Sequence, residues 1–470
     1  MSGLQQVVPA PGQLHRIKRV KNQHYVRDGK KSYGHALRKY NIKPTVPGPF
    51  DMIDIIQHAE TQHVLRRLQD RLRGRPTHVS HRQLVTKDEN GEVGEVSAED
   101  VQGDAEYLCQ VGIGSPQQQM SLDFDTGSAD LYTWSTELPS HVQSEGKKSK
   151  HNIFNHALSH TWKPLSGETW TITYGDGSSA GGNVGTDVVE LGGIQIKNQA
   201  VELASRMSSS FRSNQGDGLL GLAFDTINTV QPNQVHTPVQ NMIQQAAIPA
   251  GSELFTAHLG SVNDTSDPDN GSSFYTFGVI DAQVLASNKA TVNDIHYTPV
   301  DNSNGFWQVA SSTYTINGTQ HSTAGHTAVM DTGTTLALVD DQTCKNIYAA
   351  IPGTKLDNSV GGYIFPTSTP TASLPLVGFA IGNATFTISR EDLAFAPAGN
   401  GYSYGGIQSA GDLPFAIYGD VVLRNIYAIF DVGKMQFGCI QRLDSSTAPN
   451  AGNDKCGSHG NSCQSCDRKD

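Results

Sequence analysis

Long hydrophobic runs are missing from this 470-residue chain. No stretch approaches the roughly 18 apolar residues that a membrane-spanning helix requires, so we expect no membrane partner. The segment 1–25 also lacks the apolar core of a secretory signal peptide, because Pro9, Pro11 and a basic stretch follow Val7-Val8. We interpret this absence in one of two ways: the true start of the protein lies further upstream, or the protein is not exported by the usual route.

Cysteine is also scarce. The six cysteines are Cys109, Cys344, Cys439, Cys456, Cys463 and Cys466. We expect the first three to be buried and to act as small apolar residues. The spacing of Cys463 and Cys466 is that of a redox or metal pair, but no second such pair exists and the surrounding residues are polar. We therefore predict a disordered tail over 443–470, no metal site and no cofactor.

Basic residues are few in the main part of the chain and concentrate at its beginning. Residues 1–87 contain 17 lysines and arginines against 5 acidic residues, whereas the remainder contains 17 against 40. Such a basic arm could bind nucleic acid or the acidic body of the same chain. The arm lacks the interleaved aromatic residues of a stacking surface, so we favour the body as its partner and expect no nucleic-acid binding.

The basic arm has two predicted parts. A first basic segment ends at His35-Ala-Leu-Arg-Lys-Tyr40, and Pro44 interrupts it. Residues 51–73 have apolar side chains near one helical face and arginines in the last turns, so we predict an amphipathic helix there. The polar stretch 75–104 is typical of a linker.

Beyond Ala105 the sequence indicates β structure. Short alternating runs rich in Val, Ile, Thr and Tyr, such as Trp170–Tyr174 and Ala384–Ile388, are separated by Gly-, Asn-, Asp- and Ser-rich turns. Helical patterns are few, and the best of them cover Pro238–Ala247 and Asp341–Ala350. We predict a mostly β protein with antiparallel sheets.

A short motif occurs twice in this β-rich part. Asp125-Thr-Gly recurs 206 residues later as Asp331-Thr-Gly, and each copy follows an apolar, strand-like run. A second pair of landmarks, Leu219-Leu-Gly221 and Ile417-Tyr-Gly419, follows the two copies by 96 and 88 residues. One Asp-Thr-Gly alone would be ordinary turn chemistry. Two ordered landmarks in each half predict two related lobes that meet at a pair of carboxylates.

Together with Tyr174-Gly-Asp-Gly-Ser178, these motifs occur in the order and at the intervals of a known family. The chain resembles the pepsin-like aspartic endopeptidases, and its sequence is most similar in character to the fungal penicillopepsin and aspergillopepsin group. The resemblance implies a mostly β, bilobal pepsin-like fold, with two related antiparallel β lobes and the active-site cleft between them. The implied segments are a basic propeptide at 1–87, an acidic linker with the maturation site at 88–104, an N-terminal lobe at 105–300, a C-terminal lobe at 301–442 and the tail at 443–470.

The implied function is that of an acid endopeptidase made as a self-activating zymogen. It would hydrolyse protein and peptide substrates, with a preference for large apolar residues at the cleaved bond, and we expect a monomer. Two carboxylates held close together share a proton, and aspartic proteases are the standard example. Asp125 and Asp331 would be catalytic, one acting as general base on a water while the other protonates or hydrogen-bonds the peptide carbonyl oxygen. The alternative is a non-catalytic homologue that binds peptides or proteins in the same cleft.

The neighbours of both aspartates match supporting positions of the family. The glycines have no Cβ atom, so the backbone can approach the carboxylates closely. The hydroxyl residues after the glycines correspond to groups that hydrogen-bond the outer carboxylate oxygens, and the threonines before the glycines correspond to residues that join the two loops. The implied supporting residues are Thr126, Gly127, Ser128, Thr332, Gly333 and Thr334.

The segment Tyr174–Ser178 lies between two strand-like runs, so we predict the tip of a hairpin. In the family this hairpin is the flap, which closes over the substrate and excludes water. The implied substrate-binding residues are Tyr174, Gly175, Asp176, Ser178 and Leu219, with the leucine in the wall of an apolar pocket. A surface turn and an ordinary core leucine are the alternatives.

Several residues depart from the family pattern. Tyr132 stands where the family has a tryptophan that supports the flap tyrosine, and Tyr418 replaces the usual leucine. Thr367 and Ser403 replace the cysteines of the fungal disulfide, a loss that would cost about 2–4 kcal/mol without compensation. Asp123 is similar to fungal members, although a polar residue on an exposed strand face is an equal alternative.

The family also gives the basic arm a function. A propeptide lysine in a Lys-Tyr pair directs its ammonium group at the two aspartates, and Lys39-Tyr40 is the match here. The prediction is that Lys39 bridges the carboxylates near neutral pH and that acid weakens this clamp. A solvated basic run is the alternative. The resemblance also implies a secreted or vacuolar protein, although no signal peptide is visible.

Overall fold

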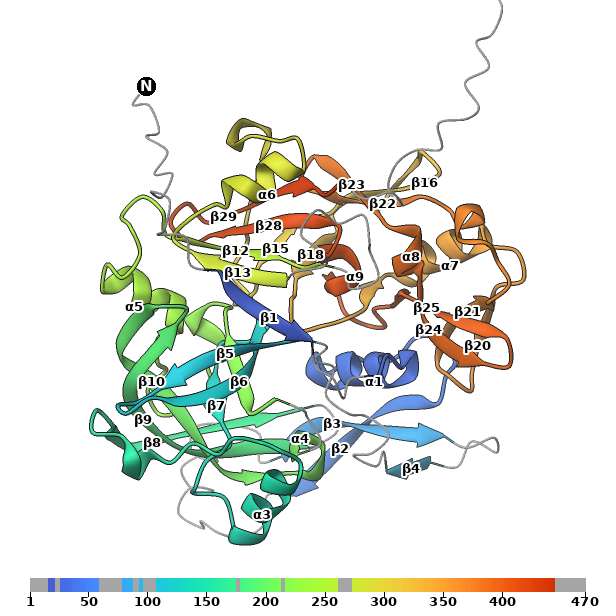
Figure 1. The fold of residues 1–470 in the computed structure, drawn as a ribbon. Helices are drawn as coiled ribbons and strands as arrows, with labels where there is room; N and C mark the ends of the chain where they lie inside the picture. The colour runs from blue at the N-terminus through green and yellow to red at the C-terminus, as the bar shows by residue number, and fades with distance from the viewer. Residues whose placement is uncertain are drawn as a thin grey trace, which may run out of the picture.

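The computed structural model describes residues 16–21, 26–58, 78–87, 93–95, 107–174, 178–212, 216–260 and 273–443. Strands dominate these ranges. In Figure 1 the body has two halves, with the segment from β5 (Tyr107–Ile113) to β11 (Gly218–Gly221) below and the orange and red segments above. The prediction of a mostly β, bilobal fold is confirmed.

One long sheet continues through both halves. Its spatial order is β14 (His296–Pro299), β29 (Gln436–Gln441), β28 (Ile426–Asp431), β12 (Leu254–His258), β13 (Ser273–Phe277), β1 (Ile17–Lys21), β5, β6 (Gln118–Asp125), β11, β7 (Leu131–Thr133), β10 (Ile194–Met207), β9 (Ser179–Leu191) and β8 (Lys163–Thr173). Strand β1 comes from the basic arm and pairs antiparallel with β13 on one side and β5 on the other. The arm therefore supplies the strand that joins the two halves of this sheet (Figure 1).

The pairing around the two Asp-Thr-Gly motifs is repeated. In the first half, β11 runs parallel to β6 and antiparallel to β7. In the second half, β27 (Ala416–Tyr418) runs parallel to β18 (Thr327–Met330) and antiparallel to β19 (Ala337–Val339). β11 contains the second landmark of the first half, and β27 contains that of the second half except for Gly419, so the repeat in the sequence is a repeat of strand pairing.

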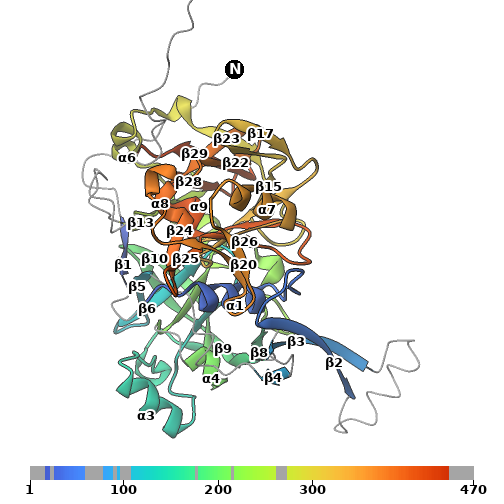
Figure 2. The same ribbon diagram turned by 90° about the vertical axis from the view of Figure 1, so that its right-hand side faces the viewer.

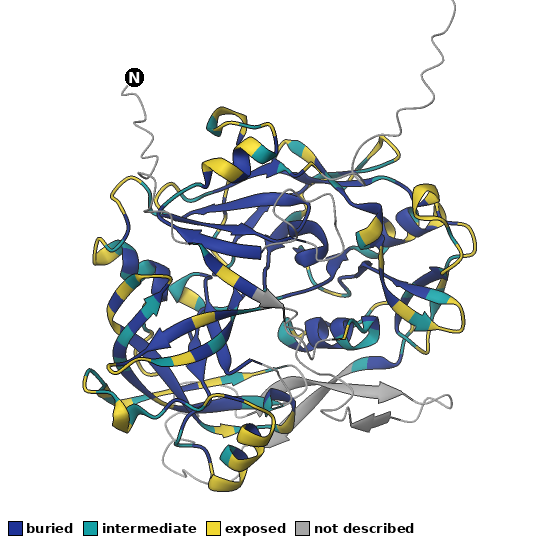
Figure 3. Ribbon diagram, viewed as in Figure 1, coloured by how far each residue is buried: buried dark blue, intermediate teal, exposed yellow. Residues whose placement is uncertain are grey.

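Smaller sheets complete the second half. The first adds β15 (Gln308–Ala310) and β26 (Ile407–Ser409) to β18, β27 and β19; the second contains β17 (Thr319–Ser322), β16 (Thr313–Ile316), β22 (Val377–Ile381) and β23 (Ala384–Ile388); the third contains β20 (Lys355–Asp357), β21 (Gly362–Pro366), β25 (Tyr402–Gly405) and β24 (Ala394–Gly399). The strand predicted at 384–388 is thus confirmed. Figure 3 shows buried residues along the strands of both halves, and Cys109, Cys344 and Cys439 are buried and free, as predicted.

Helices are short and lie outside the sheets. Both predicted helices are confirmed as α5 (Pro238–Gln244) and α7 (Asp341–Ala349), and side chains of Thr237 and Asp340 cap them. The other helices of the body are α3 (Ser140–Lys148), α4 (Ser209–Arg212), α6 (Ala282–Ser287), α8 (Arg390–Leu393) and α9 (Asp420–Leu423). Among the helices in the described ranges, none has the length and hydrophobicity that crossing a membrane requires.

The basic segment before Tyr40 forms α1 (Gly29–Lys39), a helix that the sequence reading did not predict. The Asp28 carboxylate accepts a hydrogen bond from the Lys31 backbone and begins the helix, and Arg38 and Lys39 suit the negative end of the helix dipole. Most residues of α1 are buried although the helix is basic. Figures 1 and 2 show the reason, since α1 lies between the two halves of the body.

The helix predicted over 51–73 is wrong where the structure describes it. Residues 50–58 form strand β2 (Phe50–His58), which pairs antiparallel along its length with β3 (His78–Lys87). The cause is the β-branched content of this run, which contains three isoleucines, together with a distant partner that local periodicity does not reveal. Residues 59–73 lie outside the described ranges.

The predicted linker at 75–104 is wrong for two segments as well. Strand β3 falls within it, and β4 (Val93–Glu95) pairs with β3. A polar strand without an apolar face looks like a linker in the sequence, whereas backbone pairing alone is enough to extend it. Figure 2 shows the β2–β3 hairpin extending away from the body.

Thr367 and Ser403, which replace the fungal disulfide, still contact each other. Their hydroxyl oxygens are 3.1 Å apart, and either can donate the hydrogen bond. Such a bond stabilises by about 0.5–1.5 kcal/mol, less than a disulfide does. It lies where β21 and β25 pair, so the sheet keeps a side-chain link at this point.

Candidate active site

The two Asp-Thr-Gly loops are joined to each other by their threonines. The Thr332 backbone N–H donates to Thr126 Oγ1 at 2.9 Å, and the Thr126 N–H donates to Thr332 Oγ1 at 3.2 Å. Each hydroxyl in turn donates to a backbone carbonyl of the opposite loop, at Met330 and Phe124. These four buried bonds fix the two loops relative to each other.

Asp125 is the last residue of β6 and is 2% exposed. Its Oδ1 accepts from the Gly127 N–H and its Oδ2 from the Ser128 hydroxyl, both at 2.7 Å. A Cβ atom at Gly127 would lie 2.6 Å from Asp331 Oδ1, so only glycine lets this loop approach the opposite carboxylate.

Asp331 directly follows β18 and is fully buried. Its Oδ1 accepts from the Gly333 N–H at 2.9 Å, and its Oδ2 accepts from the Thr334 hydroxyl. The two aspartates therefore have matching hydrogen-bond partners.

The two carboxyl groups ionise differently in this state. Burial raises the pKa of Asp125 to about 6 against the opposing effect of Lys39. Burial also opposes the charge of Asp331, but Lys39 and hydrogen bonds from Asp125, Thr334 and Tyr40 outweigh it and hold the pKa of Asp331 below its usual range. Because each aspartate acts on the other and both contact Lys39, the two carboxyl groups titrate as a unit.

Lys39, at the end of α1, lies between the two carboxylates. Its Nζ is 2.9 Å from Asp125 Oδ1 and 2.9 Å from Asp331 Oδ2, and its side chain is 6% exposed. Burial opposes the charge, but the two aspartates outweigh burial and raise the pKa of the Lys39 ammonium group. The Tyr40 hydroxyl donates to Asp331 Oδ2 at 2.7 Å. The arm therefore occupies the space in front of both aspartates.

Two further residues of α1 contact Tyr174. The His35 ring meets the Tyr174 ring edge-on at 6.2 Å between centroids, and the Arg38 guanidinium lies 5.9 Å from the same ring. His35 is 7% exposed, and its Nδ1 has no hydrogen-bond partner in the described part of the chain. Burial, Arg38 and Lys39 lower the pKa of His35 to about 3.

The hairpin that carries Tyr174 is formed by β8 and β9, as predicted. The Tyr174 N–H donates to the Ser178 carbonyl oxygen at 2.9 Å, and the Tyr174 ring stacks on Phe211 at 4.8 Å. Gly175, Asp176 and Gly177 lie outside the described residues, so the predicted contacts of Gly175 and Asp176 stay predictions.

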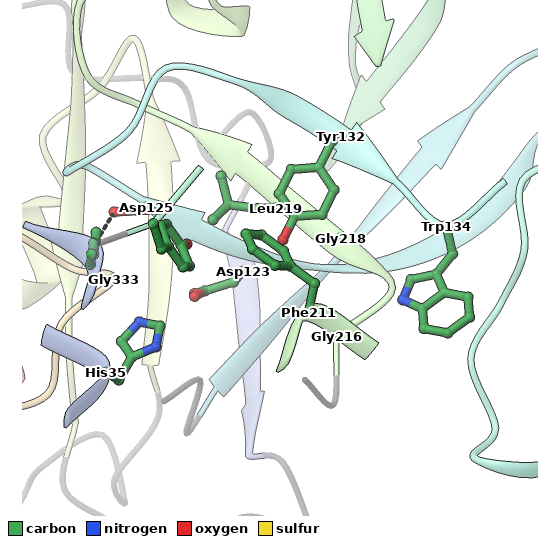
Figure 4. A pocket seen from close by; sticks show the side chains of 12 residues that line it. His35, Asp123, Asp125, Tyr132, Trp134, Phe211, Gly216, Gly218, Leu219 and Gly333 are labelled. Atoms are coloured by element: carbon green, nitrogen blue, oxygen red, sulfur yellow. Dashed lines mark hydrogen bonds and ion pairs between the residues drawn. The ribbon is translucent and has the colours of Figure 1, made fainter. Parts of the chain in front are cut away.

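A cavity lies beneath this hairpin (Figure 4). Its lining includes Leu219, at 8% exposure, together with Tyr132, Phe211, Asp123 and His35. Asp123 is half-buried here and does not lie on an exposed strand face; burial and the nearby Asp125 raise the pKa of Asp123 to about 8. The sequence alone did not decide between a place in the site, as in fungal members, and an exposed strand face for Asp123.

The two tyrosines that differ from the family pattern, Tyr132 and Tyr418, are accommodated in different ways. Tyr132 stacks on Trp170 at 5.2 Å, so its ring packs beneath the hairpin. The Tyr418 hydroxyl hydrogen-bonds the Ser311 hydroxyl at 2.5 Å, and the Tyr418 carbonyl accepts from the Asp331 N–H. The larger side chain beneath the dyad thus has a polar partner.

Sequence reasoning missed several residues that contact the arm or the loops. Phe306 packs on Tyr40 at 5.9 Å, and His35 was noted only as part of a basic segment. No local signal marks them, because their role depends on the arm folding back onto the body. Within the described ranges, no group of three or more His, Cys, Asp or Glu side chains is arranged to hold a metal ion.

Comparison with known proteins agrees with this geometry. The family model for eukaryotic aspartyl protease matches residues 106–441. Aspergillopepsin-1 of Aspergillus pseudoglaucus is 40% identical over 346 residues, which is 73% of this chain and 81% of that protein. Penicillopepsin-1 of Penicillium janthinellum is 41% identical over 337 residues, which is 71% of this chain and 94% of that protein. Endothiapepsin of Cryphonectria parasitica is 39% identical over 331 residues, which is 70% of this chain and 73% of that protein. The chain belongs to the eukaryotic aspartyl protease family and is a pepsin-like aspartic endopeptidase, with proteins or peptides as its substrates.

Proposed function

We propose that the chain is an acid endopeptidase zymogen in which Asp125 and Asp331 activate a water molecule and the basic arm keeps them inactive. The observation that carries the proposal is the Lys39 ammonium group, at 2.9 Å from a carboxylate oxygen of each aspartate. A cation at this position pairs with both acids and fills the space in front of them. Neither group can then accept a proton from water.

Once the arm leaves, a water molecule can take the position of Lys39 Nζ between the two carboxyl groups. One carboxylate removes a proton from this water as the oxygen attacks the carbonyl carbon of the peptide bond. The other carboxyl group donates its proton to the carbonyl oxygen. Collapse of the tetrahedral intermediate transfers a proton to the leaving amine, and no acyl-enzyme forms.

The proposed substrate preference follows from the cavity beside the dyad. Its walls include Tyr174, Phe211 and Leu219, which offer apolar surface to a large side chain at the cleaved bond. Burying such a side chain contributes about 1.5–3 kcal/mol. Asp123 adds a polar group at the same cavity, and we propose that the enzyme acts as a monomer.

The test is incubation of the purified full-length chain at pH values from 3 to 7. Cleavage of a denatured protein substrate, N-terminal sequencing and intact mass would be followed together. Activity should appear only at acid pH, in step with loss of the arm, and a statine-type inhibitor should block it. The Asp331→Asn chain is the control and should stay intact. Full activity of the uncleaved chain at neutral pH would contradict the zymogen.

His35 should make arm release respond to pH separately from the dyad. Its pKa is about 3 in the docked arm and about 6.5 for a free histidine, so the released arm binds the extra proton between these values. Docking is therefore weakened as the pH falls from about 6.5 towards 3. His35→Phe keeps a ring against Tyr174 but cannot be protonated, and it should slow activation at pH 4.5 by about tenfold or more.

The control for this prediction is His141→Phe, which changes an exposed histidine of α3. Activation half-times from pH 3 to 6.5 are the measurement. Equal half-times for His35→Phe and the unchanged chain over this whole interval would remove His35 from the pH response.

A further inference from the structure

Two acidic side chains meet in the interior beside the catalytic loop, and the proposed mechanism does not use them. Glu202 lies on β10 and Asp130 lies just before β7, and they are 1% and 2% exposed. One amide nitrogen, Nδ2 of Asn228, donates to an oxygen of each carboxyl group, so the two acids are close neighbours. Glu202 Oε2 is buried without a hydrogen-bond partner in the described part of the chain, and one proton shared with the neighbouring Asp130 would satisfy it.

Asn228 holds the acidic pair in place. Its Nδ2 donates to Asp130 Oδ1 at 2.9 Å and to Glu202 Oε1 at 3.1 Å, and it also reaches the Ala129 carbonyl at 3.1 Å. The Thr229 N–H donates to Asp130 Oδ1 at 2.8 Å. The pair and its neighbours form one buried hydrogen-bond network.

This network is continuous with the loop that carries Asp125. Ala129 follows Ser128, whose hydroxyl donates to Asp125 Oδ2 at 2.7 Å. The Ser128 carbonyl accepts from Ala223, and the Asp130 carbonyl accepts from Gly221. The loop is therefore held by the dyad at one end and by the acidic pair at the other.

The surroundings favour a single negative charge on the pair. Burial raises the pKa of Asp130 to about 6, and Asp125 acts in the same direction. Burial and the charge of Asp130 raise the pKa of Glu202 well above its usual value. No cation is among the main influences on either group, so a second charge would be buried without a partner.

We propose that Glu202 is a positioning residue for peptide hydrolysis: it shares one proton with Asp130, holds the loop of Asp125 and Ser128 in its working geometry, and releases that loop when the proton is lost near neutral pH. The inference rests on the proposed role of Asp125. It gives the matured enzyme an upper pH limit that is separate from titration of the dyad.

The direction of the pH effect follows from the proton count. Both acids hold their protons more tightly in the folded state than in the unfolded chain, so the folded state binds more protons as the pH rises above about 4. The stabilisation from the pair is complete below this range and is lost as the pH rises through the folded pKa values. The loss of this stabilisation begins with Asp130, whose pKa in the folded state is about 6.

Glu202→Gln is the decisive variant. Glutamine donates an N–H to Asp130 at every pH, so the pair keeps one negative charge without needing a proton. Matured enzyme would be held at pH 5 to 8 and then assayed at pH 4, which separates lasting damage from reversible titration of the dyad. The midpoint of inactivation should move upward by about one pH unit or more. Asp130→Asn also leaves one charge and should shift the midpoint in the same direction.

Glu202→Ala tests positioning in the acid range. Glu202 does not touch the cavity, so kcat at pH 4 should fall by about tenfold or more with KM changed by less than about threefold, and Glu202→Gln should restore kcat to within about threefold. Glu145→Gln, an exposed change on α3, is the control and should leave the midpoint where it is.

An unchanged inactivation midpoint in both Glu202→Gln and Asp130→Asn would overturn the inference, as would full kcat in Glu202→Ala. Thermal unfolding of the same variants across this pH range reports on the pair without any activity. A failure of the proposed role of Glu202 is therefore distinguishable from a failure of the dyad mechanism, which the Asp125 and Asp331 variants test directly.

Discussion

Replacing Asp125 or Asp331 with asparagine should lower kcat by at least about 10³-fold while the fold is retained. Asparagine has nearly the shape of aspartate and can keep contacts with the loop N–H groups. It cannot accept a proton from water, and the pair loses the shared proton that the mechanism requires. The measurement is kcat on a peptide substrate at pH 4, with circular dichroism and thermal unfolding to show that the variant is folded.

These variants cannot remove their own arm. Immobilised wild-type enzyme should therefore be used to cleave it, and the resin removed before the assay. Asp294→Asn, an exposed change far along the chain from the dyad, is the matched control and should have wild-type kcat. Retention of more than about a tenth of kcat in either dyad variant would exclude the proposed mechanism.

Lys39→Ala should give a zymogen that activates at near-neutral pH, where the unchanged chain remains intact. Removing one partner of a buried ion pair costs about 3–5 kcal/mol, because the remaining charges are left without compensation. Here two carboxylates lose the same cation, and its side chain is only 6% exposed. The population with a released arm should rise by about 10²-fold or more, and the activation half-time at pH 6.5 should shorten accordingly.

Lys18→Ala is the matched control for this prediction. It removes the same charge from the same arm, but Lys18 is exposed on β1 and has no contact with the dyad. Its activation half-time should be within about twofold of the unchanged chain. Equal half-times for Lys39→Ala and Lys18→Ala would show that net charge of the arm, and not the Lys39 bridge, controls release.

The sequence predicted the parts of the site that depend on short, repeated motifs. Asp125 ends β6 and Asp331 follows β18, and the two aspartates are brought together because the pairing of β6 with β11 repeats that of β18 with β27. Local residue order is enough to detect such a repeat. The same is true of the β8–β9 hairpin, whose alternation and turn residues are local.

The arm could not be predicted in the same way. Residues 51–58 have apolar residues at helical spacing, yet they form a strand because β3 pairs with them along their full length. Helix α1 is basic and looks solvated, but it is buried between two acidic halves that the sequence places far away. Glu202 and Asn228 are likewise separated from Asp130 by long stretches of chain, and only the folded lobe joins them.

If the arm is removed as proposed, the position of β1 means that this step changes the architecture of the sheet. β1 lies in its interior, with backbone bonds to β13 on one side and β5 on the other. Loss of β1 would leave two facing edges about 9–10 Å apart, twice the spacing of paired strands and too far for direct hydrogen bonds. Those edges must recruit another segment or draw the halves together, since unpaired interior backbone groups are costly. A cleaved arm that returned would therefore meet a different surface, so we expect the proposed inhibition by the arm to be irreversible once the arm has left.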